Sequence, residues 1–229
     1  MIRTQNLSKV FSTGDVDTIA LKNVNLSVNN GEFVAVMGPS GCGKSTLLNV
    51  LGLIDNPTGG EYYFLGEEVS KFNEKKRALL RKKNIGFVFQ SFNLIDDLTV
   101  YENVELPLLY LGVPPQQRKE KVHSVLERMN IFFKKKHFPQ QLSGGQQQQA
   151  AIARAIVSDP LIILADEPTG NLDSANGKDV MNSLTALNEA GTIIIMVTHS
   201  PEYAEYSHRL VHLFDGHIVS ENIRKTAVD

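Results

Sequence analysis

The chain has 229 residues, a formal net charge of −2 and 42% hydrophobic residues, which is ordinary for a globular protein with a sizeable core. This near-neutral charge argues against a nucleic-acid partner. No stretch reaches the roughly 18 apolar residues that a membrane-spanning helix needs, and the N-terminus lacks a signal-peptide pattern. Cys42 is the only cysteine, so an intramolecular disulfide is excluded. Any membrane role is expected to be peripheral.

The N-terminal part of the chain predicts short strands that lead into a glycine-rich turn and a helix. Alternating or continuous apolar patterns predict strands at residues 21–28, 32–37, 62–65 and 85–89. The helix follows the turn at residues 44–53, where Leu47, Leu48 and Leu51 fall on one face.

The middle of the chain, residues 98–157, has a mainly helical pattern that is interrupted at Pro114–Pro115 and at Pro139. Beyond it, strands are expected at residues 161–165, 193–197 and 210–214, and Asp215–Gly216 is a hairpin turn signal. Strands that alternate with helices predict an α/β fold with a largely parallel sheet. The helical block is interpreted as an insertion into that fold.

Residues 38–45, GPSGCGKS, match a phosphate-binding loop between a strand and a helix. Glycines let successive N–H groups approach a phosphate, and the helix N-terminus adds positive partial charge. Lys44 is the cation expected to contact the β- and γ-phosphates, and Ser45 is the expected Mg²⁺ ligand. The full set of expected nucleotide contacts here is Gly38, Ser40, Gly41, Cys42, Gly43, Lys44, Ser45 and Thr46.

Two carboxylates end the apolar strand LIILADE at residues 161–167. Asp166 is expected to hold Mg²⁺, and Glu167 is expected to orient or deprotonate the attacking water. Two acids at the start of a loop are weak evidence alone, but their place after a phosphate loop in one α/β fold favours catalysis.

The segment LSGGQ at residues 142–146 opens a predicted helix with the Ser143 hydroxyl and the amides of Gly144 and Gly145. A helix N-terminus of this kind is a second anion site. One chain with two phosphate sites and one nucleotide suggests that the sites belong to different subunits. The alternative is a serine cap followed by flexible glycines.

Along nearly its whole length the chain resembles the ATP-binding subunits of ABC transporters. The motif order matches: the phosphate loop, Gln90, LSGGQ at 142–146 with Gln146, the acids 166–167, Asp173 and His199. GFVFQSFNLI, ENVELPLL and ILADEPTGNLD resemble the branch for lipoprotein release, macrolide export and antimicrobial-peptide resistance. The cell-division ATPases are also similar.

The resemblance implies a role for each matching residue. Phe11 would stack on adenine, although it could be a core aromatic. Gln90 would bind Mg²⁺ and the attacking water, and His199 would contact the γ-phosphate. Asp173 would cross a dimer interface, and it could also cap the helix that follows. Two positions depart from the family pattern, Gln149 where arginine is common and Ser200 where aspartate is common.

The fold implied is a two-lobed ABC ATPase with a P-loop core, an N-terminal antiparallel β subdomain and an inserted helical subdomain. The core would comprise residues 1–90 and 159–229, and the helical subdomain residues 91–158. ATP and Mg²⁺ are the expected cofactors. The expected partners are a second copy of the chain and a permease with a large extracytoplasmic domain, at the cytoplasmic face of the inner membrane.

Other functions stay open at this point. A cell-division ATPase would use the same chemistry for mechanical signalling without cargo. A DNA-repair or translation ATPase would need a long coiled coil or two cassettes, and a regulator without turnover would not need Glu167 and His199. The apolar run 106–113 could dock a permease helix or fill the core. The lysine-rich segments 75–83 and 134–136 are interpreted as solvated surfaces rather than lipid-binding sites.

Overall fold

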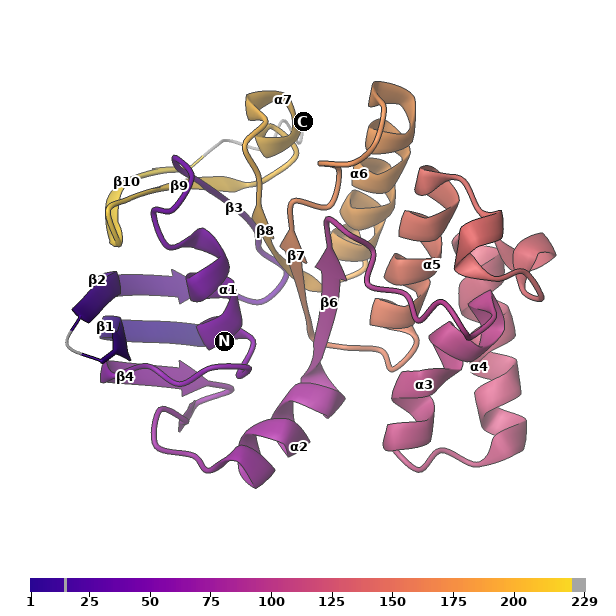
Figure 1. The fold of residues 1–229 in the computed structure, drawn as a ribbon, viewed down its shortest axis with the longest axis horizontal. Coiled ribbons are helices and arrows are strands. Elements are labelled where there is room, and N and C mark those ends of the chain that lie inside the picture. The colour runs from indigo at the N-terminus through magenta and orange to yellow at the C-terminus, as the bar shows by residue number, and fades with distance from the viewer. Residues whose placement is uncertain (15, 224–229) are drawn as a thin grey trace.

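The computed structural model describes residues 1–14 and 16–223. In Figure 1 an N-terminal sheet lies on one side, a second sheet runs through the middle, and a group of helices lies on the other side. The N-terminal sheet has the order β2–β1–β4–β5 and its paired strands are antiparallel. Its strands are β1 (Ile2–Thr13), β2 (Val16–Val28), β4 (Gly59–Phe64) and β5 (Glu67–Glu68).

The central sheet has the order β10–β9–β3–β8–β7–β6. All neighbouring pairs from β9 to β6 are parallel, and β10 pairs antiparallel with β9 across the predicted turn at Asp215–Gly216. The strands are β3 (Phe33–Met37), β6 (Ile85–Phe89), β7 (Ile162–Asp166), β8 (Ile193–Val197), β9 (Arg209–Phe214) and β10 (His217–Ile223). The predicted α/β fold with a parallel sheet is confirmed.

Helices α3, α4 and α5 pack on one another beyond the β6 edge of the sheet, and α5 also contacts β6. Pro115 begins α4 and Pro139 begins a 3₁₀ turn, so both prolines start elements, as their missing N–H allows. The helices are α1 (Lys44–Leu51), α2 (Glu74–Asn84), α3 (Val100–Tyr110), α4 (Pro115–Arg128), α5 (Gly144–Ile156), α6 (Ser174–Glu189) and α7 (Pro201–Ala204), with 3₁₀ turns at Phe132–Lys134 and Pro139–Gln141. Within the described residues, none of these helices has the length and apolar character to cross a membrane.

The central sheet is buried on both faces, which explains its continuous apolar strands. In β3, Phe33 and Ala35 face a core shared with α3 to α6, whereas Val34 and Val36 face a core shared with α1 and the N-terminal sheet. This alternation follows the two-residue period of a strand. The first of these cores continues from β6 through α5 to α6, so the packing does not mark where one lobe ends and the next begins. The predicted lobe boundaries at 91 and 158 therefore stay a prediction.

Two features differ from the sequence expectations. The strands of the N-terminal sheet are longer than the short strands predicted, and register shifts along β1 obscure their alternation. Helix α2 was interpreted only as a basic cluster, because it has no apolar stripe. Its buried residues are Arg77 and Asn84, and Arg77 pairs with Glu74 at 2.5 Å.

The parallel register aligns four strand ends at one edge of the sheet. Val36 of β3 pairs with Val197 of β8, Val197 pairs with Asp166 of β7, and Asp166 pairs with Phe89 of β6. The residues that follow these strands therefore begin their loops at the same level, which is where parallel α/β sheets bind ligands. The loop after β3 is the phosphate loop. The loops after the other three strands contain Thr198 and His199, Glu167 and Gln90.

Gly86 allows α5 to lie directly against β6, and this gives the first prediction. A Cβ at this position would lie 2.4 Å from the carbonyl oxygen of Ala155. We expect Gly86→Ala to lower the free energy of unfolding by about 1–3 kcal/mol, because the helix must shift outward.

Gly59→Ala is the matched control, since its Cβ would come no closer than 3.8 Å to another atom. Urea unfolding of both variants measures the difference. Equal stability of Gly86→Ala and the unchanged protein would show that α5 does not need this close approach.

Candidate functional site

The phosphate loop, residues 38–45, connects the end of β3 to the start of α1. Gly43 precedes the helix with φ of 105°, and a Cβ there would lie 2.3 Å from the carbonyl oxygen of Ala20. Only glycine fits this conformation and this approach of β2. No side chain caps the helix, and its first turn contains no acid, so its N–H groups can bind an anion.

Lys44 lies within this loop and is only 6% exposed. Its Nζ donates hydrogen bonds to the carbonyl oxygens of Gly38 and Pro39 at 2.9 and 2.8 Å. Cys42 is also buried, with its Sγ 4.0 Å from that Nζ. The loop thus holds one ammonium group against its own backbone, beside the start of α1.

A cavity of about 240 Å³ adjoins the phosphate loop and is lined by Ser45, Phe89, Gln90, Ser91, Asn93, Asp166 and Glu167. It brings together the three predicted metal ligands, which offer a hydroxyl, an amide carbonyl and a carboxylate oxygen. Oxygen donors of this kind suit Mg²⁺. Thr46 is half-buried on α1 and does not line the cavity. Among the residues that the structure describes, no cluster of three or more His, Cys, Asp or Glu offers another metal site.

Glu167 and His199 form a pair at this edge of the sheet. The Oε1 atom of Glu167 lies 2.6 Å from Nε2 of His199. Glu167 has φ of 49°, and its N–H donates to the carbonyl oxygen of Val197 at 2.9 Å. A positive φ in a residue other than glycine is uncommon, and such conformations cluster at functional sites. The neighbouring strands β7 and β8 therefore place the two residues side by side.

Gln90 follows β6 and contacts the loop between β7 and α6. Its Nε2 donates to Oδ1 of Asn171 at 3.2 Å, while Nδ2 of Asn171 donates to the Gln90 carbonyl oxygen at 3.1 Å. Sequence reasoning missed Asn171. Its signals were its place in the segment ILADEPTGNLD and in the loop that directly follows the two acids.

Gln148 is a second residue that sequence reasoning missed. It is fully buried in α5, and its Nε2 donates to the carbonyl oxygen of Pro168 at 2.6 Å and, more weakly, to that of Phe89 at 3.4 Å. These two carbonyl groups flank Glu167 and Gln90 in the sequence. Gln148 therefore connects α5 to both loops, and the glutamine run 146–149 gave no sign of which member is buried.

The segment LSGGQ, residues 142–146, forms the N-terminus of α5. The Oγ atom of Ser143 accepts from the N–H of Gln146, and the Gln146 side chain accepts from the N–H of Ser143, which is a capping box. Gly145 lies against Asn176 of α6, where a Cβ would come within 2.1 Å of its Oδ1. The cavity beside the phosphate loop is lined by none of the residues 142–146. The chain does not bring its two anion sites together.

Asp173 caps the N-terminus of α6, as the alternative interpretation proposed. Its two carboxylate oxygens accept from the backbone N–H of Asn176 at 2.9 Å and from its Nδ2 at 2.6 Å. These hydrogen bonds, the backbone one first, hold the pKa of Asp173 below its usual range. Ser200 similarly caps the short helix α7 by accepting from the N–H of Tyr203 at 3.4 Å. A serine therefore performs here the capping that an aspartate also performs.

Phe11 lies on β1 and is 43% exposed, so it is not a core residue. Nζ of Lys9 lies 4.8 Å from the centre of its ring. Phe11 pairs with Thr18 of β2, two residues before Ala20, which contacts Gly43 of the phosphate loop. At about 3.3 Å per strand residue, the ring lies near enough for one nucleotide to reach both places.

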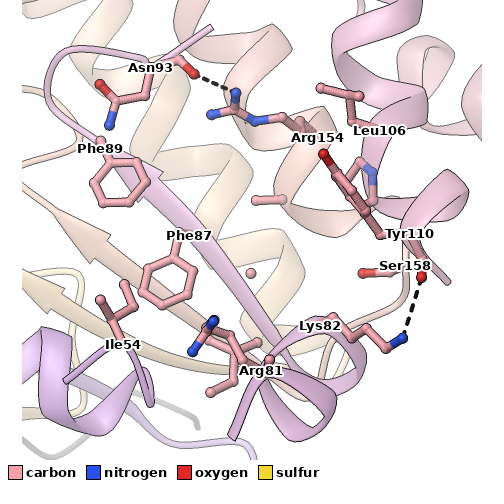
Figure 2. Close-up of a pocket in the computed structure, with 15 residues that line it drawn as sticks. Ile54, Arg81, Lys82, Phe87, Phe89, Asn93, Leu106, Tyr110, Arg154 and Ser158 are labelled. Carbon is pink, nitrogen blue, oxygen red and sulfur yellow. Dashed lines mark hydrogen bonds between the residues drawn. The ribbon is translucent and has the colours of Figure 1, made fainter. Parts of the chain in front are cut away.

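A larger groove of about 670 Å³ lies between α2, β6, α3 and α5 (Figure 2). Phe87 and Phe89 stack on its floor with ring centres 5.7 Å apart. Its lining residues are Ile54, Ala78, Arg81, Lys82, Ile85, Gly86, Phe87, Phe89, Asn93, Leu106, Pro107, Tyr110, Arg154, Ala155 and Ser158. Three of them are cations and none is an acid. Burial lowers the pKa of Arg154, which donates to the Asn93 carbonyl oxygen, as Figure 2 shows.

Comparisons with known proteins agree with this geometry. Residues 21–170 match the family described as ABC transporter. The uncharacterized ABC transporter ATP-binding protein MJ1508 of Methanocaldococcus jannaschii is 51% identical, covering 96% of this chain and 98% of the relative. The lipoprotein-releasing system ATP-binding protein LolD of Aquifex aeolicus is 47% identical, covering 98% of each chain.

The macrolide export ATP-binding/permease protein MacB of Brucella melitensis is 46% identical, and this chain spans only 35% of its length. Among solved structures, a dimer of the ATP-binding cassette MJ0796 bound to ADP and Pi, in a post-hydrolysis state, has a TM-score of 0.91 at 42% identity. It covers 97% of this chain and 98% of that chain. The chain therefore belongs to the ABC transporter family and has the fold of its ATP-binding cassettes, with LolD and MacB among its relatives.

Proposed function

We propose that the chain hydrolyses ATP to ADP and phosphate and thereby powers a membrane permease. The observation that carries this proposal is the cavity beside the phosphate loop, where Ser45, Gln90, Asp166 and Glu167 meet and where His199 lies 2.6 Å from Glu167. The solved relative MJ0796, with ADP and Pi bound, supports the same reaction.

Each group has a role in this reaction. The N–H groups of α1 and the Lys44 ammonium bind the phosphates, and Phe11 stacks on the adenine. Ser45, Gln90 and Asp166 would hold Mg²⁺, and the bound ion would neutralise negative charge on the phosphates.

Glu167 accepts a proton from the water whose oxygen attacks the γ-phosphorus, while the bond to the ADP oxygen breaks. His199 orients Glu167. His199, Lys44 and Gln90 stabilise the negative charge that develops on the γ-phosphate.

The separation of the two anion sites supports a dimer. Ser143, Gly144, Gly145 and Gln146 open α5 but do not line the cavity. In a head-to-tail pair, the segment 142–146 of one copy would cover the γ-phosphate bound to the other copy. Asp173 lies near this segment, because α6 begins where Asn176 contacts Gly145. The dimeric structure of MJ0796 is a precedent for such a pair.

The groove in Figure 2 is the proposed docking site for the permease. Its apolar floor suits one face of a helix. Arg81 is already paired with Glu74 at 3.1 Å, so Lys82 and Arg154 are the cations that suit an acidic side chain on that helix. Phe89 and Asn93 line both this groove and the cavity beside the phosphate loop. A helix seated in the groove would therefore contact Phe89 and Asn93, which lie on either side of Gln90 in the sequence.

The partner is proposed to be an integral membrane permease with a large extracytoplasmic domain, and the chain to lie at the cytoplasmic face of the inner membrane. The names of LolD and MacB favour lipoprotein release or export as the process. Mechanical signalling without cargo, as in cell-division ATPases, is not favoured.

The general base gives the second prediction. Glu167→Gln keeps the shape of the side chain but cannot accept a proton, so we expect hydrolysis to fall by about 10²–10⁴-fold while ATP binding survives. With hydrolysis blocked, MgATP should hold two copies together, and sedimentation should show a dimer with ATP and a monomer without it.

Adding Ser143→Arg to this variant places a large side chain where the γ-phosphate of the other copy would lie. The double variant should bind ATP and stay monomeric. Hydrolysis by Glu167→Gln at the unchanged rate would remove Glu167 from the role of base. An ATP-bound Glu167→Gln protein that never dimerises would count against the paired arrangement.

The docking groove gives the third prediction. Tyr110 is 73% exposed at the groove, and aromatic anchors of this kind often dominate interfaces. We expect Tyr110→Ala to weaken binding to the detergent-solubilised permease by at least about tenfold, with ATP binding by the isolated chain unchanged.

Phe133→Ala is the control, because Phe133 is an aromatic of similar exposure, at 65%, and lies outside the groove. Surface plasmon resonance with the immobilised permease measures both variants. If Phe133→Ala weakens binding and Tyr110→Ala does not, the permease docks elsewhere.

A further inference from the structure

We propose that Asn171 is a positioning residue that determines which end of the Gln90 side-chain amide is available to a metal ion. The inference rests on the proposed role of Gln90 as an Mg²⁺ ligand. It concerns a residue of the segment ILADEPTGNLD to which the sequence analysis assigned no role.

The orientation of both side-chain amides follows from one backbone group, the carbonyl oxygen of Gln90. The carbonyl oxygen of Gln90 can only accept a hydrogen bond, so the end of the Asn171 amide that faces it at 3.1 Å must be the NH₂ group. The other end of Asn171 is then its carbonyl oxygen. That oxygen lies 3.2 Å from the nearer end of the Gln90 side-chain amide. Because an oxygen can only accept here, this end of Gln90 must be its NH₂ group, which donates the hydrogen bond.

This leaves the Oε1 atom as the end of Gln90 that Asn171 does not engage. The distinction matters because Mg²⁺ binds oxygen atoms, whereas an amide NH₂ group is a donor and repels a cation. Without a neighbour that distinguishes the two ends, the amide can turn over and present either one. The Asn171 contact therefore selects the orientation that can bind a metal.

Gly170 supplies the space for this contact. A Cβ at position 170 would lie 2.7 Å from Nε2 of Gln90 and 2.9 Å from its Cδ. The Gln90 side chain therefore lies directly against the Gly170 backbone. Gln148 already fixes the backbone on both sides through the carbonyl groups of Phe89 and Pro168. The side-chain orientation of Gln90 is the remaining freedom, and Asn171 is placed to restrict it.

The main experiment measures the free Mg²⁺ concentration that gives half-maximal binding of a fluorescent, non-hydrolysable ATP analogue, adenylyl imidodiphosphate. For Asn171→Leu we expect this concentration to rise about threefold to tenfold, because the hydrogen bond that orders the Gln90 side chain is lost. Binding of the analogue without Mg²⁺ should not change. Asn171 is exposed, so the substitution leaves no cavity. Asn182 is also an exposed asparagine, and it lies on α6. The control variant Asn182→Leu should behave like the unchanged protein.

A double-mutant cycle shows whether Asn171 acts through Gln90. Gln90→Ala should raise the Mg²⁺ requirement, and adding Asn171→Leu to it should cause no further rise. If the two effects add, or if Asn171→Leu alone changes nothing or lowers the requirement, the inference is wrong while the role of Gln90 stands. If Gln90→Ala itself changes nothing, the proposed metal role of Gln90 fails and the inference fails with it.

A measurement without nucleotide or metal tests the pair directly. In ¹⁵N-labelled protein, the Gln90 side-chain NH₂ signals are identified by their loss in Gln90→Ala. Hydrogen exchange of these NH₂ protons with water should be slower than for exposed glutamines, and Asn171→Leu should accelerate it. Exchange at the rate of an exposed glutamine in the unchanged protein would show that the Gln90–Asn171 contact does not form in solution.

Discussion

Backbone hydrogen bonds between β3, β8, β7 and β6 align the carboxyl ends of four parallel strands, and the proposed chemistry depends on this alignment. Val36, Val197, Asp166 and Phe89 form one row across the sheet. The phosphate loop, His199, Glu167 and Gln90 begin just beyond that row. The inner strands are buried on both faces, so a one-residue shift of one strand would exchange the side chains that fill the two cores and disrupt the packing of both. A rigid core thereby positions the loops that follow this row.

The same arrangement connects three regions whose residues are far apart in the sequence. They are the cavity beside the phosphate loop, the groove in Figure 2 and the N-terminus of α5. Gln148 joins α5 to Phe89 and Pro168, which adjoin Gln90 and Glu167 in the sequence. Phe89 and Asn93 line both the cavity beside the phosphate loop and the proposed docking groove. Gly145 brings the start of α5 against α6. If a permease helix occupies the proposed docking groove, its displacement, or a displacement of α5, would reach Gln90 through these contacts, and this is the coupling route that the proposal implies.

Much of this could be predicted from the sequence, because motifs such as GPSGCGKS and LSGGQ record local backbone requirements. The parallel sheet was evident from apolar strands that alternate with helices. Contacts between distant residues were not evident. Gln90 and Asn171 are 81 residues apart, and no local pattern shows that they meet. Helix α2 was missed because it buries polar side chains instead of an apolar stripe. The glutamine run 146–149 likewise gave no reason to single out Gln148, which only the packing of α5 identifies.

The central claim is that the phosphate loop of one copy works with the segment 142–146 of another. It is tested most directly by mixing two variants that both carry Glu167→Gln, one with Lys44→Ala and the other with Ser143→Arg. Neither should dimerise alone with MgATP. Their mixture contains one intact phosphate loop and one intact segment 142–146 on opposite copies, so sedimentation should show a heterodimer with one bound nucleotide. If the mixture stays monomeric although the Ser143→Arg protein binds ATP, or if that protein dimerises by itself, the two sites do not act across subunits.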